Sequence, residues 1–406
     1  MMEHFVNRKT FDDVMVPNYM PQSIIPVKGK GAHVWDQQGR EYIDFSGGIA
    51  VNALGHCHPQ LLRVLQYQSK RLWHLSNVYT NEPALSLAKK LIECTFADKV
   101  FFCNSGTEAN EAAFKLARKY AYDNTGPEKH EIIGFTSAFH GRSLFTVSVG
   151  GQKKYREGFA PTPKGITHVP FNDISALEAA ISDKTCAVVM EPIQGEGGIF
   201  PADDDFLKAV RKLCDQYNAL LVFDEIQTGM GRTGHLFAYM DTEVVPDIMT
   251  SAKALGAGFP IAAMLATDKV ARSLGLGTHG STYGGNPLAC SVALETLNII
   301  NREDLLANVT RKHTLFRKKL ERINEKYSLF KEIRGKGLLI GAELNPPWHG
   351  RAKEFLSAGI RHGVMLLIAG PNIIRMTPPL IIPDKDIKTG MKYLEQAVAE
   401  IYDENK

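Results

Sequence analysis

The sequence predicts an α/β protein in which a mostly parallel sheet, flanked by helices, is joined to a smaller α+β domain. Between residues 99 and 224, short apolar runs alternate with segments of helical spacing, a pattern typical of parallel sheets whose strands are linked by helices. After Asn286 the pattern changes to long helices with few strands. At 406 residues the chain also exceeds one ordinary core, because a domain holds roughly 100–200 residues.

The predicted sheet begins with Lys99–Cys103, an apolar run that ends at Asn104. A helix is expected over Glu108–Tyr122, where apolar residues recur at helical spacing. Phe206–Tyr217 is predicted to be an amphipathic helix. Three further runs are apolar at consecutive positions, as in strands buried on both faces: Ile132–Phe135, Ala187–Met190 and Leu220–Phe223.

The last hundred residues predict the smaller domain. Helices are expected at Pro287–Asn301, Asn308–Tyr327, Ala352–His362 and Asp384–Tyr402, with a strand at Gly337–Leu344. Near the other end, short strands are expected at Ala32–Trp35 and Tyr42–Phe45, with little core of their own. We therefore expect residues 1–50 to pack with a C-terminal domain of residues 301–406, and residues 51–300 to form the large domain.

Composition excludes several classes of protein. The chain is 44% hydrophobic and 22% charged, with a net charge of +3, so neither a disordered protein nor a nucleic-acid-binding protein is predicted. The apolar run Ile261–Ala266 is far shorter than the ~20 residues that span a bilayer. Met1–Phe5 shows no signal-peptide pattern, and the six cysteines form no C-x-x-C pair. We therefore expect a cytoplasmic protein with reduced thiols and with no membrane or nucleic-acid partner.

Two residues suggest covalent chemistry. Asp224 directly follows the buried run Leu220–Phe223, at the edge where open α/β sheets place ligand contacts, although a helix cap or an ion pair would explain it equally well. Lys253 is the only charged residue between Ala252 and Thr267, in a Gly-rich apolar stretch. A desolvated lysine is a good Schiff-base nucleophile, so we interpret Lys253 as reactive.

A third element is the start of the predicted helix that follows residue 104. Ser105 and Glu108 have the spacing of a capping box, and Gly106 lets a ligand approach the backbone. Such a helix start can bind phosphate, although by itself it is more often only a cap. A Schiff-base lysine, a strand-end carboxylate and a phosphate cradle are together what pyridoxal phosphate requires.

Two other motifs carry weaker signals. Gly229-Met-Gly-Arg-Thr-Gly234 matches G-x-G-x-x-G, which leaves a nicotinamide-dependent dehydrogenase as a remote alternative. In that fold, however, the glycines directly follow the strand, whereas here five residues intervene. His56-Cys57-His58 lacks a further cluster of ligands, so no metal is expected.

Seven longer stretches of the sequence match a known pattern: Phe45–His56, Asn104–Asn110, Phe139–Arg142, Glu191–Glu196, Asp224–Gln227, Ser251–Lys253 and Gly280–Asn286. With these stretches the chain resembles the class III, fold type I pyridoxal-phosphate aminotransferases over essentially its whole length. The resemblance implies the fold type I architecture, pyridoxal 5'-phosphate as cofactor, and a homodimer with shared active sites.

The resemblance also implies roles for individual residues. Lys253 would hold the cofactor as a Schiff base and move the proton, while Asp224 would pair with the pyridine nitrogen. The other cofactor contacts implied are Ser105, Gly106 and Thr107 for phosphate, Phe139 on the ring face, Gln227 at the phenolic oxygen, and Thr282 at the phosphate of the neighbouring subunit. Arg142, with Ser281 nearby, and Arg375 would bind substrate carboxylates, although Met376 stands where the family often has an aromatic residue.

The implied substrates are N2-acetyl-L-ornithine and 2-oxoglutarate, which give N-acetyl-L-glutamate 5-semialdehyde and L-glutamate, as in arginine biosynthesis. Glutamate needs two arginines, but acetylornithine has no carboxylate at its reacting carbon. An unpaired buried Arg375 would be costly, so Glu196 is expected to neutralise it; the alternative is a fixed glutamate in a turn.

Succinylornithine, used in arginine catabolism, and N-succinyl-diaminopimelate, used in lysine synthesis, remain alternatives. Ser76–Asn81 and Phe145–Gly151 favour the biosynthetic enzyme, whereas Leu367–Gly370 favours the catabolic one. A racemase or decarboxylase on the same cofactor is disfavoured, because only a transaminase must alternate between two substrates.

Overall fold

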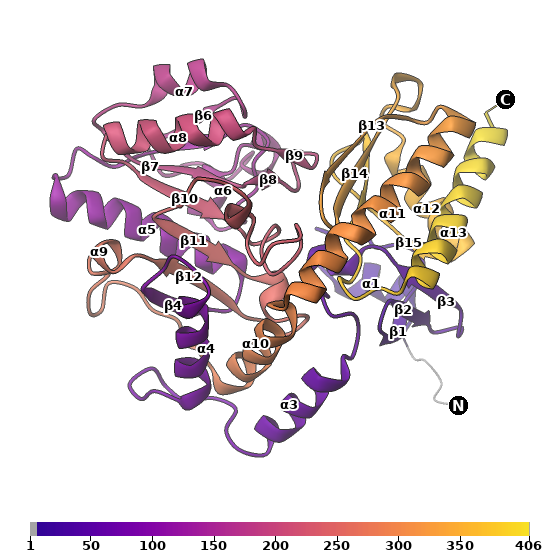
Figure 1. Ribbon diagram of the computed structural model, residues 1–406, viewed down its shortest axis with the longest axis horizontal. Helices are drawn as coiled ribbons and strands as arrows, with labels where there is room; N and C mark the ends of the chain where they lie inside the picture. Colours follow the sequence, from indigo (N-terminus) through magenta and orange to yellow (C-terminus); the bar gives the residue numbers. More distant parts are fainter. Residues whose placement is uncertain (1–5, 406) are drawn as a thin grey trace.

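A seven-stranded sheet forms the centre of the larger lobe, on the left of Figure 1. In the computed structural model, β12 is antiparallel to both of its neighbours, and the other strands run parallel to one another. The predicted, mostly parallel sheet is thus confirmed. In order across the sheet, the strands are β4 (Lys99–Cys103), β12 (Ala262–Ala266), β11 (Ile248–Ser251), β10 (Leu220–Asp224), β7 (Thr185–Met190), β5 (Glu131–Phe135) and β6 (Ile166–Val169).

Both faces of this sheet are covered, and its central strands β7, β10 and β11 are buried at every position. In β10, Leu220 and Val222 belong to the apolar cluster of helix α5 (Gly106–Asn124). Leu221 and Phe223 point the other way and join the cluster that contains helix α8 (Asp204–Gln216). Side chains alternate between the two faces of a strand, so a continuous apolar run is what this two-sided burial requires.

The smaller lobe, on the right of Figure 1, combines both ends of the chain, as predicted. One antiparallel sheet packs against α11 (Glu303–Tyr327) and α12 (Ala352–His362). In order across this sheet, the strands are β13 (Phe330–Lys336), β14 (Leu339–Leu344), β17 (Ile373–Met376) and β16 (Leu367–Ile368). A second sheet contains β1 (Pro26–Lys30), β2 (His33–Asp36) and β3 (Glu41–Asp44). Here β3 pairs in parallel with β15 (Val364–Met365), and this pairing joins the N-terminal strands to the C-terminal part. Helix α13 (Asp384–Asp403) packs on α11 and α12.

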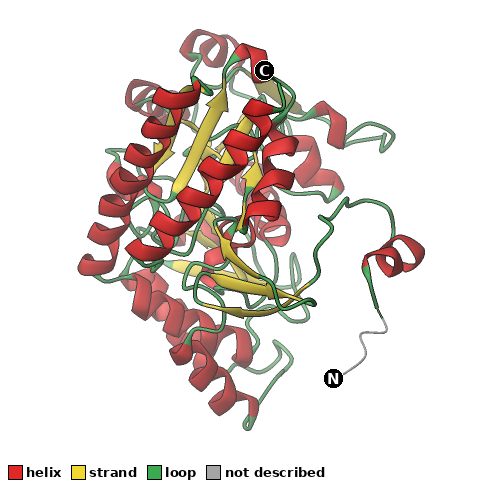
Figure 2. Ribbon diagram, turned by 90° about the vertical axis from the view of Figure 1, so that its right-hand side faces the viewer, coloured by secondary structure: helices red, strands yellow, loops and turns green. Residues whose placement is uncertain are grey.

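Helices α10 (Pro287–Ile300) and α11 follow one another from the large lobe into the small one in Figure 1. Helix α10 packs on α3 (Pro59–Ser69) and α4 (Glu82–Glu93). Figure 2 shows α1 (Arg8–Val14) standing away from the rest of the chain. The remaining elements are α2 (Gly47–Ala50), α6 (Leu144–Val149), α7 (Ile174–Ala180), α9 (Asp268–Ala271), β8 (Ile193–Gln194), β9 (Phe200–Pro201) and four short 3-10 turns.

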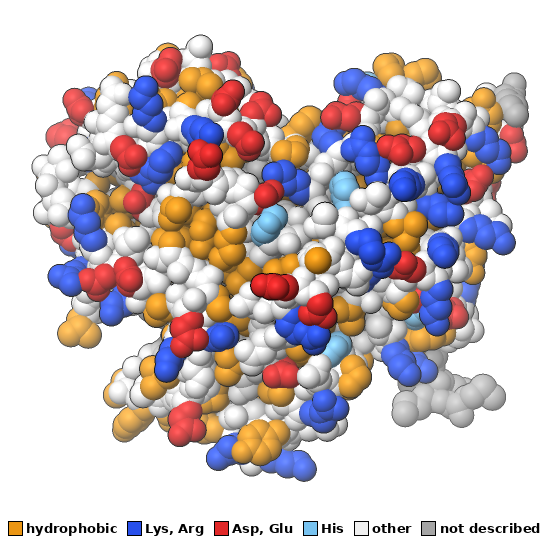
Figure 3. Space-filling model, viewed as in Figure 1, with side chains coloured by type: hydrophobic (Ala, Val, Ile, Leu, Met, Phe, Trp, Pro, Cys, Tyr) orange, Lys and Arg blue, Asp and Glu red, His pale blue; other side chains and the backbone are white. Residues whose placement is uncertain are grey.

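The structure describes residues 6–405, so Met1–Phe5, where the sequence shows no signal-peptide pattern, lie outside it. Within this range no helix is both long and apolar enough to cross a membrane. On the face drawn in Figure 3, basic and acidic side chains are interspersed, and a notch separates the two lobes at the top of the view. The domain boundaries at residues 50 and 300 stay predictions.

The loop Gly229–Gly234, which matches a dinucleotide motif in sequence, has a packing role in the structure. It leads into a 3-10 turn rather than a long helix. The buried Arg232 side chain donates to the carbonyl oxygens of Leu338 (3.0 Å) and Pro378 (2.6 Å), both in the C-terminal third of the chain. The motif therefore joins the two lobes and does not open a nucleotide-binding helix.

Candidate active site

The carboxyl ends of the parallel strands border a cavity of about 370 Å³. The residues that follow β4, β7 and β11 line this cavity, as does the last residue of β10. Open α/β sheets bind ligands at this edge. Among its lining residues the cavity brings together seven of the predicted site residues: Ser105, Gly106, Thr107, Phe139, Asp224, Gln227 and Lys253.

Lys253 stands at the start of a 3-10 turn directly after β11. Its backbone is left-handed (φ 45°), a conformation that costs a non-glycine residue about 1–3 kcal/mol and is found mostly at functional sites. Burial lowers the pKa of its amine to about 8, even though the nearby carboxylate of Glu196 acts in the opposite direction. More of the amine is therefore neutral, and so nucleophilic, at pH 7 than for an ordinary lysine.

Asp224 is fixed by three hydrogen bonds. Its Oδ2 accepts from Asn110 Nδ2 and from His140 Nδ1, both at 2.8 Å, and its Oδ1 accepts from the Ile226 N–H at 3.1 Å. Asn110 is held in turn by Thr250, whose hydroxyl donates to its Oδ1 at 2.8 Å. The carboxylate therefore has one orientation in the cavity wall.

His140 is the buried hydrogen-bond partner of Asp224. Its side chain is fully buried, which opposes its charge, but the hydrogen bond from Nδ1 to Asp224 raises the pKa of His140 overall. Asp224 thus presents an oriented carboxylate to a cationic group in the cavity.

Helix α5 points its N-terminus at the cavity. Ser105 caps it in a capping box: its hydroxyl accepts from the Glu108 N–H (3.3 Å), and the Glu108 carboxylate accepts from the Ser105 N–H (3.1 Å). The N–H groups of Gly106 and Thr107 belong to the first turn, where a helix provides no acceptor of its own. A Cβ on Gly106 would lie 2.7 Å from the end of the Ile226 side chain, which would have to shift to make room for it. The arrangement suits an anion such as phosphate.

Phe139 and Arg142 form an aromatic and cationic group at the cavity mouth. The Phe139 ring lies edge-to-face with Tyr155, at 5.9 Å between centroids. The guanidinium of Arg142 lies 4.6 Å from the Tyr155 ring and 5.8 Å from the Phe139 ring. Arg142 is exposed and does not line the cavity, so it is free to meet an anion from solvent.

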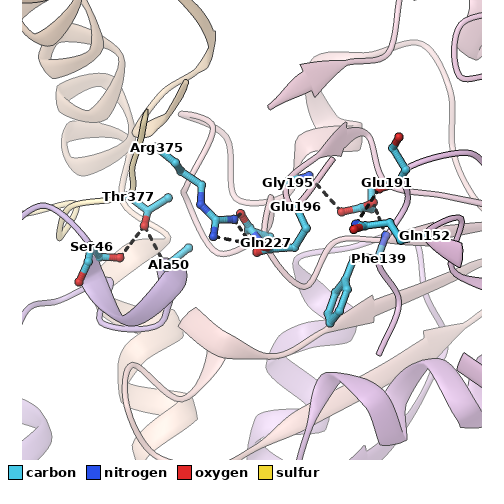
Figure 4. A network of polar contacts seen from close by, with 11 residues as sticks. Ser46, Ala50, Phe139, Gln152, Glu191, Gly195, Glu196, Gln227, Arg375 and Thr377 are labelled. Atoms are coloured by element: carbon cyan, nitrogen blue, oxygen red, sulfur yellow. Dashed lines mark hydrogen bonds and ion pairs between the residues drawn. The ribbon is translucent and has the colours of Figure 1, made fainter. Parts of the chain in front are cut away.

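Arg375 and Glu196 form an ion pair beside the cavity. Arg375, on β17, is 2% exposed, and its guanidinium binds both carboxylate oxygens of Glu196, at 2.5 and 3.3 Å. Gln227 joins them, donating to Glu196 (3.4 Å) and accepting from Arg375 (3.2 Å). Figure 4 shows Glu196 between these two side chains. Burial acts to raise the pKa of Glu196, but the neighbouring Arg375 guanidinium outweighs it and lowers this pKa. The pair is therefore an ion pair of two charged groups.

Ser281 and Thr282 lie outside the cavity wall of their own chain. The Ser281 hydroxyl accepts from Nδ2 of Asn104 at 3.2 Å. Asn104 lines the cavity, so Ser281 contacts a lining residue without lining the cavity itself. Thr282 is exposed and does not line the cavity. If Thr282 contacts a cofactor, it must be the cofactor of another subunit.

Three residues of the site were not predicted from the sequence: Asn110, His140 and Glu191. Asn110 and His140 reach Asp224 from 114 and 84 positions away, and no local pattern marks such contacts. Glu191, by contrast, directly follows the buried run Ala187–Met190. The strand-end argument that identified Asp224 would have identified Glu191 as well.

Comparison with known proteins agrees with this fold. Residues 14–398 match the family model described as aminotransferase class-III. The match covers nearly all of the chain, which therefore belongs to the class III aminotransferases.

The similar proteins include three curated relatives. Each alignment covers 98% of this chain and 98% of the relative. The acetylornithine aminotransferase of Shewanella oneidensis is 60% identical, and the acetylornithine/succinyldiaminopimelate aminotransferase of Yersinia pestis is 61% identical. The succinylornithine transaminase/acetylornithine aminotransferase of Pseudomonas aeruginosa is 59% identical.

Two solved structures are similar as well. The N-acetylornithine aminotransferase of Stenotrophomonas maltophilia is 44% identical with a TM-score of 0.85, over 94% of this chain and 97% of that one. The ornithine aminotransferase of Toxoplasma gondii is 34% identical with a TM-score of 0.93, over 98% and 95%.

Proposed function

We propose that this chain is a pyridoxal-phosphate-dependent aminotransferase that moves the δ-amino group of N2-acetyl-L-ornithine to 2-oxoglutarate. The products are N-acetyl-L-glutamate 5-semialdehyde and L-glutamate. The observation that carries this proposal is the Glu196–Arg375 ion pair beside the Lys253 cavity. The relatives named for acetylornithine support the choice of amino donor.

The residues present fit pyridoxal phosphate. The cavity has an amine with a lowered pKa, a carboxylate with fixed orientation, and the start of α5 with its unsatisfied first-turn N–H groups. These three features match the aldehyde, the pyridine nitrogen and the phosphate of the cofactor. Phe139 and Ile226 supply apolar surface for the ring. We infer that Lys253, Asp224 and Gly106 with Thr107 hold the respective parts of the cofactor.

When bound, the cofactor supplies an electron sink for the pair left as a proton leaves the amino-bearing carbon. Lys253 Nζ is the base that takes this proton and later returns it, because its amine borders the cavity and its pKa, lowered to about 8, is closer to neutral pH than that of an ordinary lysine. Asp224 would face the pyridine nitrogen and favour its protonated form, and the hydrogen bonds from Asn110 and His140 orient its carboxylate. Gln227 is placed to meet the phenolic oxygen.

The two amino donors make different demands on Arg375. In glutamate the reacting carbon carries a carboxylate, which needs a cationic partner. In acetylornithine the reacting carbon is Cδ and carries none, so Arg375 would be buried and unpaired, at a cost of several kcal/mol. Glu196 removes that cost in the arrangement seen here. Arg142, exposed at the cavity mouth, is placed to bind the other carboxylate of either donor.

A panel of kcat/KM values tests the proposed donor. The panel contains acetylornithine, succinylornithine, N-succinyl-diaminopimelate and free ornithine, with 2-oxoglutarate as the acceptor. We expect acetylornithine to be favoured over free ornithine, whose α-amino group adds a charge near Arg142. A preference for succinylornithine would replace the proposed donor by the alternative that the name of the Pseudomonas aeruginosa relative raises.

Removing Glu196 should affect the two half-reactions differently. In Glu196→Ala, Arg375 is never masked, so the acetylornithine half-reaction should slow roughly tenfold to a hundredfold, as expected for a lost charge-assisted bond of about 1–3 kcal/mol. The glutamate half-reaction should be unchanged or faster, because no carboxylate has to be displaced. Stopped-flow single-turnover rates with each donor measure both effects.

Glu343→Ala is the matched control for this variant. Glu343 pairs with the buried Arg334 at 2.5 Å in the β13–β14 hairpin, and neither residue lines the cavity. Any loss that comes only from breaking a buried Arg–Glu pair should appear equally with both donors in this control. Equal losses for the two donors in Glu196→Ala would show that Glu196 is only a structural turn residue.

We further propose a homodimer in which Thr282 completes the partner's site. The segment around Thr282 contacts residues 74–77: Asn77 donates to the Ser281 carbonyl (2.9 Å), and the His74 ring lies 5.3 Å from Tyr283. Residues 62–85, which include the contact at 74–77, carry seven exposed large apolar side chains: Leu62, Tyr67, Leu72, Trp73, Val78, Tyr79 and Leu85. Exposed apolar side chains that gather on one surface are typical of protein interfaces.

Thr282→Ala should weaken cofactor binding roughly tenfold or more, as for one lost hydrogen bond to a charged group. Thr278→Ala, in the same loop and also exposed, is the control and should have no such effect. Cofactor titration measures the affinity, and sedimentation alongside assay at high dilution measures the oligomer. A monomer with full activity would contradict the shared site.

A further inference from the structure

Glu191 is a buried carboxylate that holds two separate segments of the cavity wall. It directly follows β7, is 5% exposed and lines the cavity. Its Oε2 accepts from the Phe139 N–H, and its Oε1 accepts from the Gly195 N–H, both at 3.1 Å. Figure 4 shows the carboxylate between these two backbone groups.

Both segments carry residues of the proposed site. Phe139 lies next to His140, whose imidazole binds Asp224. Gly195 lies next to Glu196, which masks Arg375. We propose that Glu191 is a positioning residue that sets the place of Glu196 relative to Phe139. This inference rests on the proposed function, because it gives Glu191 a part in alternating between the two donors.

The loop that carries Glu196 is anchored on both sides of Gly195. Gln194 donates from Nε2 to the Thr136 carbonyl at 2.9 Å, one residue before Gly195. Arg334 donates to the Gly198 carbonyl at 2.8 Å, three residues after it. At Gly195 a Cβ would lie 2.5 Å from Gln227, so the backbone itself packs on that side chain. Between these anchors, the N–H of Gly195 is the group through which Glu191 acts on the approach of Glu196 to Arg375.

The two bonds of Glu191 need an acceptor oxygen on each side, which a carboxylate provides. An amide side chain has one acceptor oxygen and one NH₂ group, so its NH₂ group would face one of the two N–H donors. The ionised form of Glu191 has a cost in free energy, because burial disfavours its charge and raises its pKa to about 7. The charge of His140 works in the opposite direction, and that of Asp224 adds to the cost.

Glu225 offers a closely matched control. It is also a fully buried glutamate, and its two oxygens accept from the N–H groups of Ala238 and Tyr239, both at 2.8 Å. Burial raises its pKa to about 7 as well. The segment that it holds, however, lies outside the cavity wall. Glu191→Gln and Glu225→Gln therefore make the same chemical change, but only Glu191 holds segments of the cavity wall.

The test compares these two variants with the parent holoenzyme by amide hydrogen exchange and single-turnover kinetics. In Glu191→Gln, exchange should be about tenfold faster or more in peptides 136–142 or 193–198, because one bond to a charged acceptor is lost. In Glu225→Gln the increase should be confined to the peptide around residues 236–241. The acetylornithine half-reaction of Glu191→Gln should slow about tenfold more than its glutamate half-reaction, whereas the control should affect both equally.

Glu191→Asp keeps the charge but shortens the side chain by one methylene, and it provides the second measurement if the amide variant does not fold. It too should speed exchange at one of the two peptides. Unchanged exchange at both peptides, or equal losses with both donors, would overturn the proposal. If the parent enzyme does not use acetylornithine, the proposed function fails, but the exchange measurement still reports whether Glu191 holds both segments.

Discussion

Lys253→Ala should reduce turnover on the order of 10²–10⁴-fold, the range for losing a general acid–base group. That range corresponds to about 3–5 kcal/mol of transition-state stabilisation. The variant removes the amine at the cavity wall that would both hold the cofactor and move the proton. Pre-steady-state assays with saturating cofactor measure the loss, so that weaker cofactor binding does not obscure it.

A second buried lysine makes this prediction specific. Lys312 is 3% exposed and, like Lys253, has a pKa lowered by burial to about 8. Its Nζ donates to the Leu380 carbonyl at 2.7 Å in the small lobe, and it does not line the cavity. Lys312→Met should therefore lower stability without changing the turnover of the folded protein.

Borohydride reduction followed by peptide mapping should attach the cofactor to Lys253 and not to Lys312. In the cofactor-free protein, reaction of Lys253 with an aldehyde should rise with pH and be half-maximal near pH 8, because the neutral amine is the reactive form. A midpoint near the ordinary lysine value of about 10.4 would contradict the environment described here. Cofactor found on another lysine would refute the assignment of Lys253.

The sequence predicted those parts of the fold whose local pattern agrees with their tertiary environment. The run Leu220–Phe223 is apolar at every position because both faces of β10 are covered, and the structure confirms this strand with one residue added. Strand β12 was not predicted. Its residues, Ala262–Ala266, include three alanines, which favour helix at least as much as strand. Pairing with β11 and β4 makes this segment a strand.

Strand β13 shows the opposite difficulty. Phe330–Lys336 is rich in charged residues and does not show the clean alternation of a half-buried strand. Its Arg334 is nevertheless buried, because the guanidinium pairs with Glu343 and donates to the Gly198 carbonyl at 2.8 Å. A buried polar group of this kind depends on partners far away in sequence, so local patterns could not predict it.

The candidate site divides in the same way. Lys253 and Asp224 could be predicted because each stands out from its own neighbours in the sequence, as a charge beside or within an apolar run. The ion pair of Glu196 with Arg375 was expected only from resemblance to a family, since the two residues are 179 positions apart. Asn110 and His140 lie in stretches that carry the resemblance, but their contacts with Asp224 were not predicted, because neither residue stands out from its own neighbours.

Asp224→Asn should retain the cofactor but lower kcat on the order of 10²–10³-fold, the range for removing one preorganised electrostatic group at a reacting centre. An amide carries no charge, so it cannot keep a proton on the pyridine nitrogen, and the electron sink is lost. The network around it would also change. Asn110 and His140 both donate to Oδ2 of Asp224, and the amide would have to offer them its single oxygen.

Asp247→Asn is the control for this variant. Asp247 immediately precedes β11 and so lies at the amino edge of the same sheet, away from the cavity. It also accepts two hydrogen bonds at one oxygen, from the Leu221 N–H at 2.7 Å and from Arg211 at 2.9 Å. The control should lose stability but keep its turnover per folded molecule.

Absorbance of the bound cofactor shows whether each variant is loaded. A fall in kcat of less than about tenfold in loaded Asp224→Asn, worth ~1.4 kcal/mol, would mean that Asp224 does not hold the pyridine nitrogen.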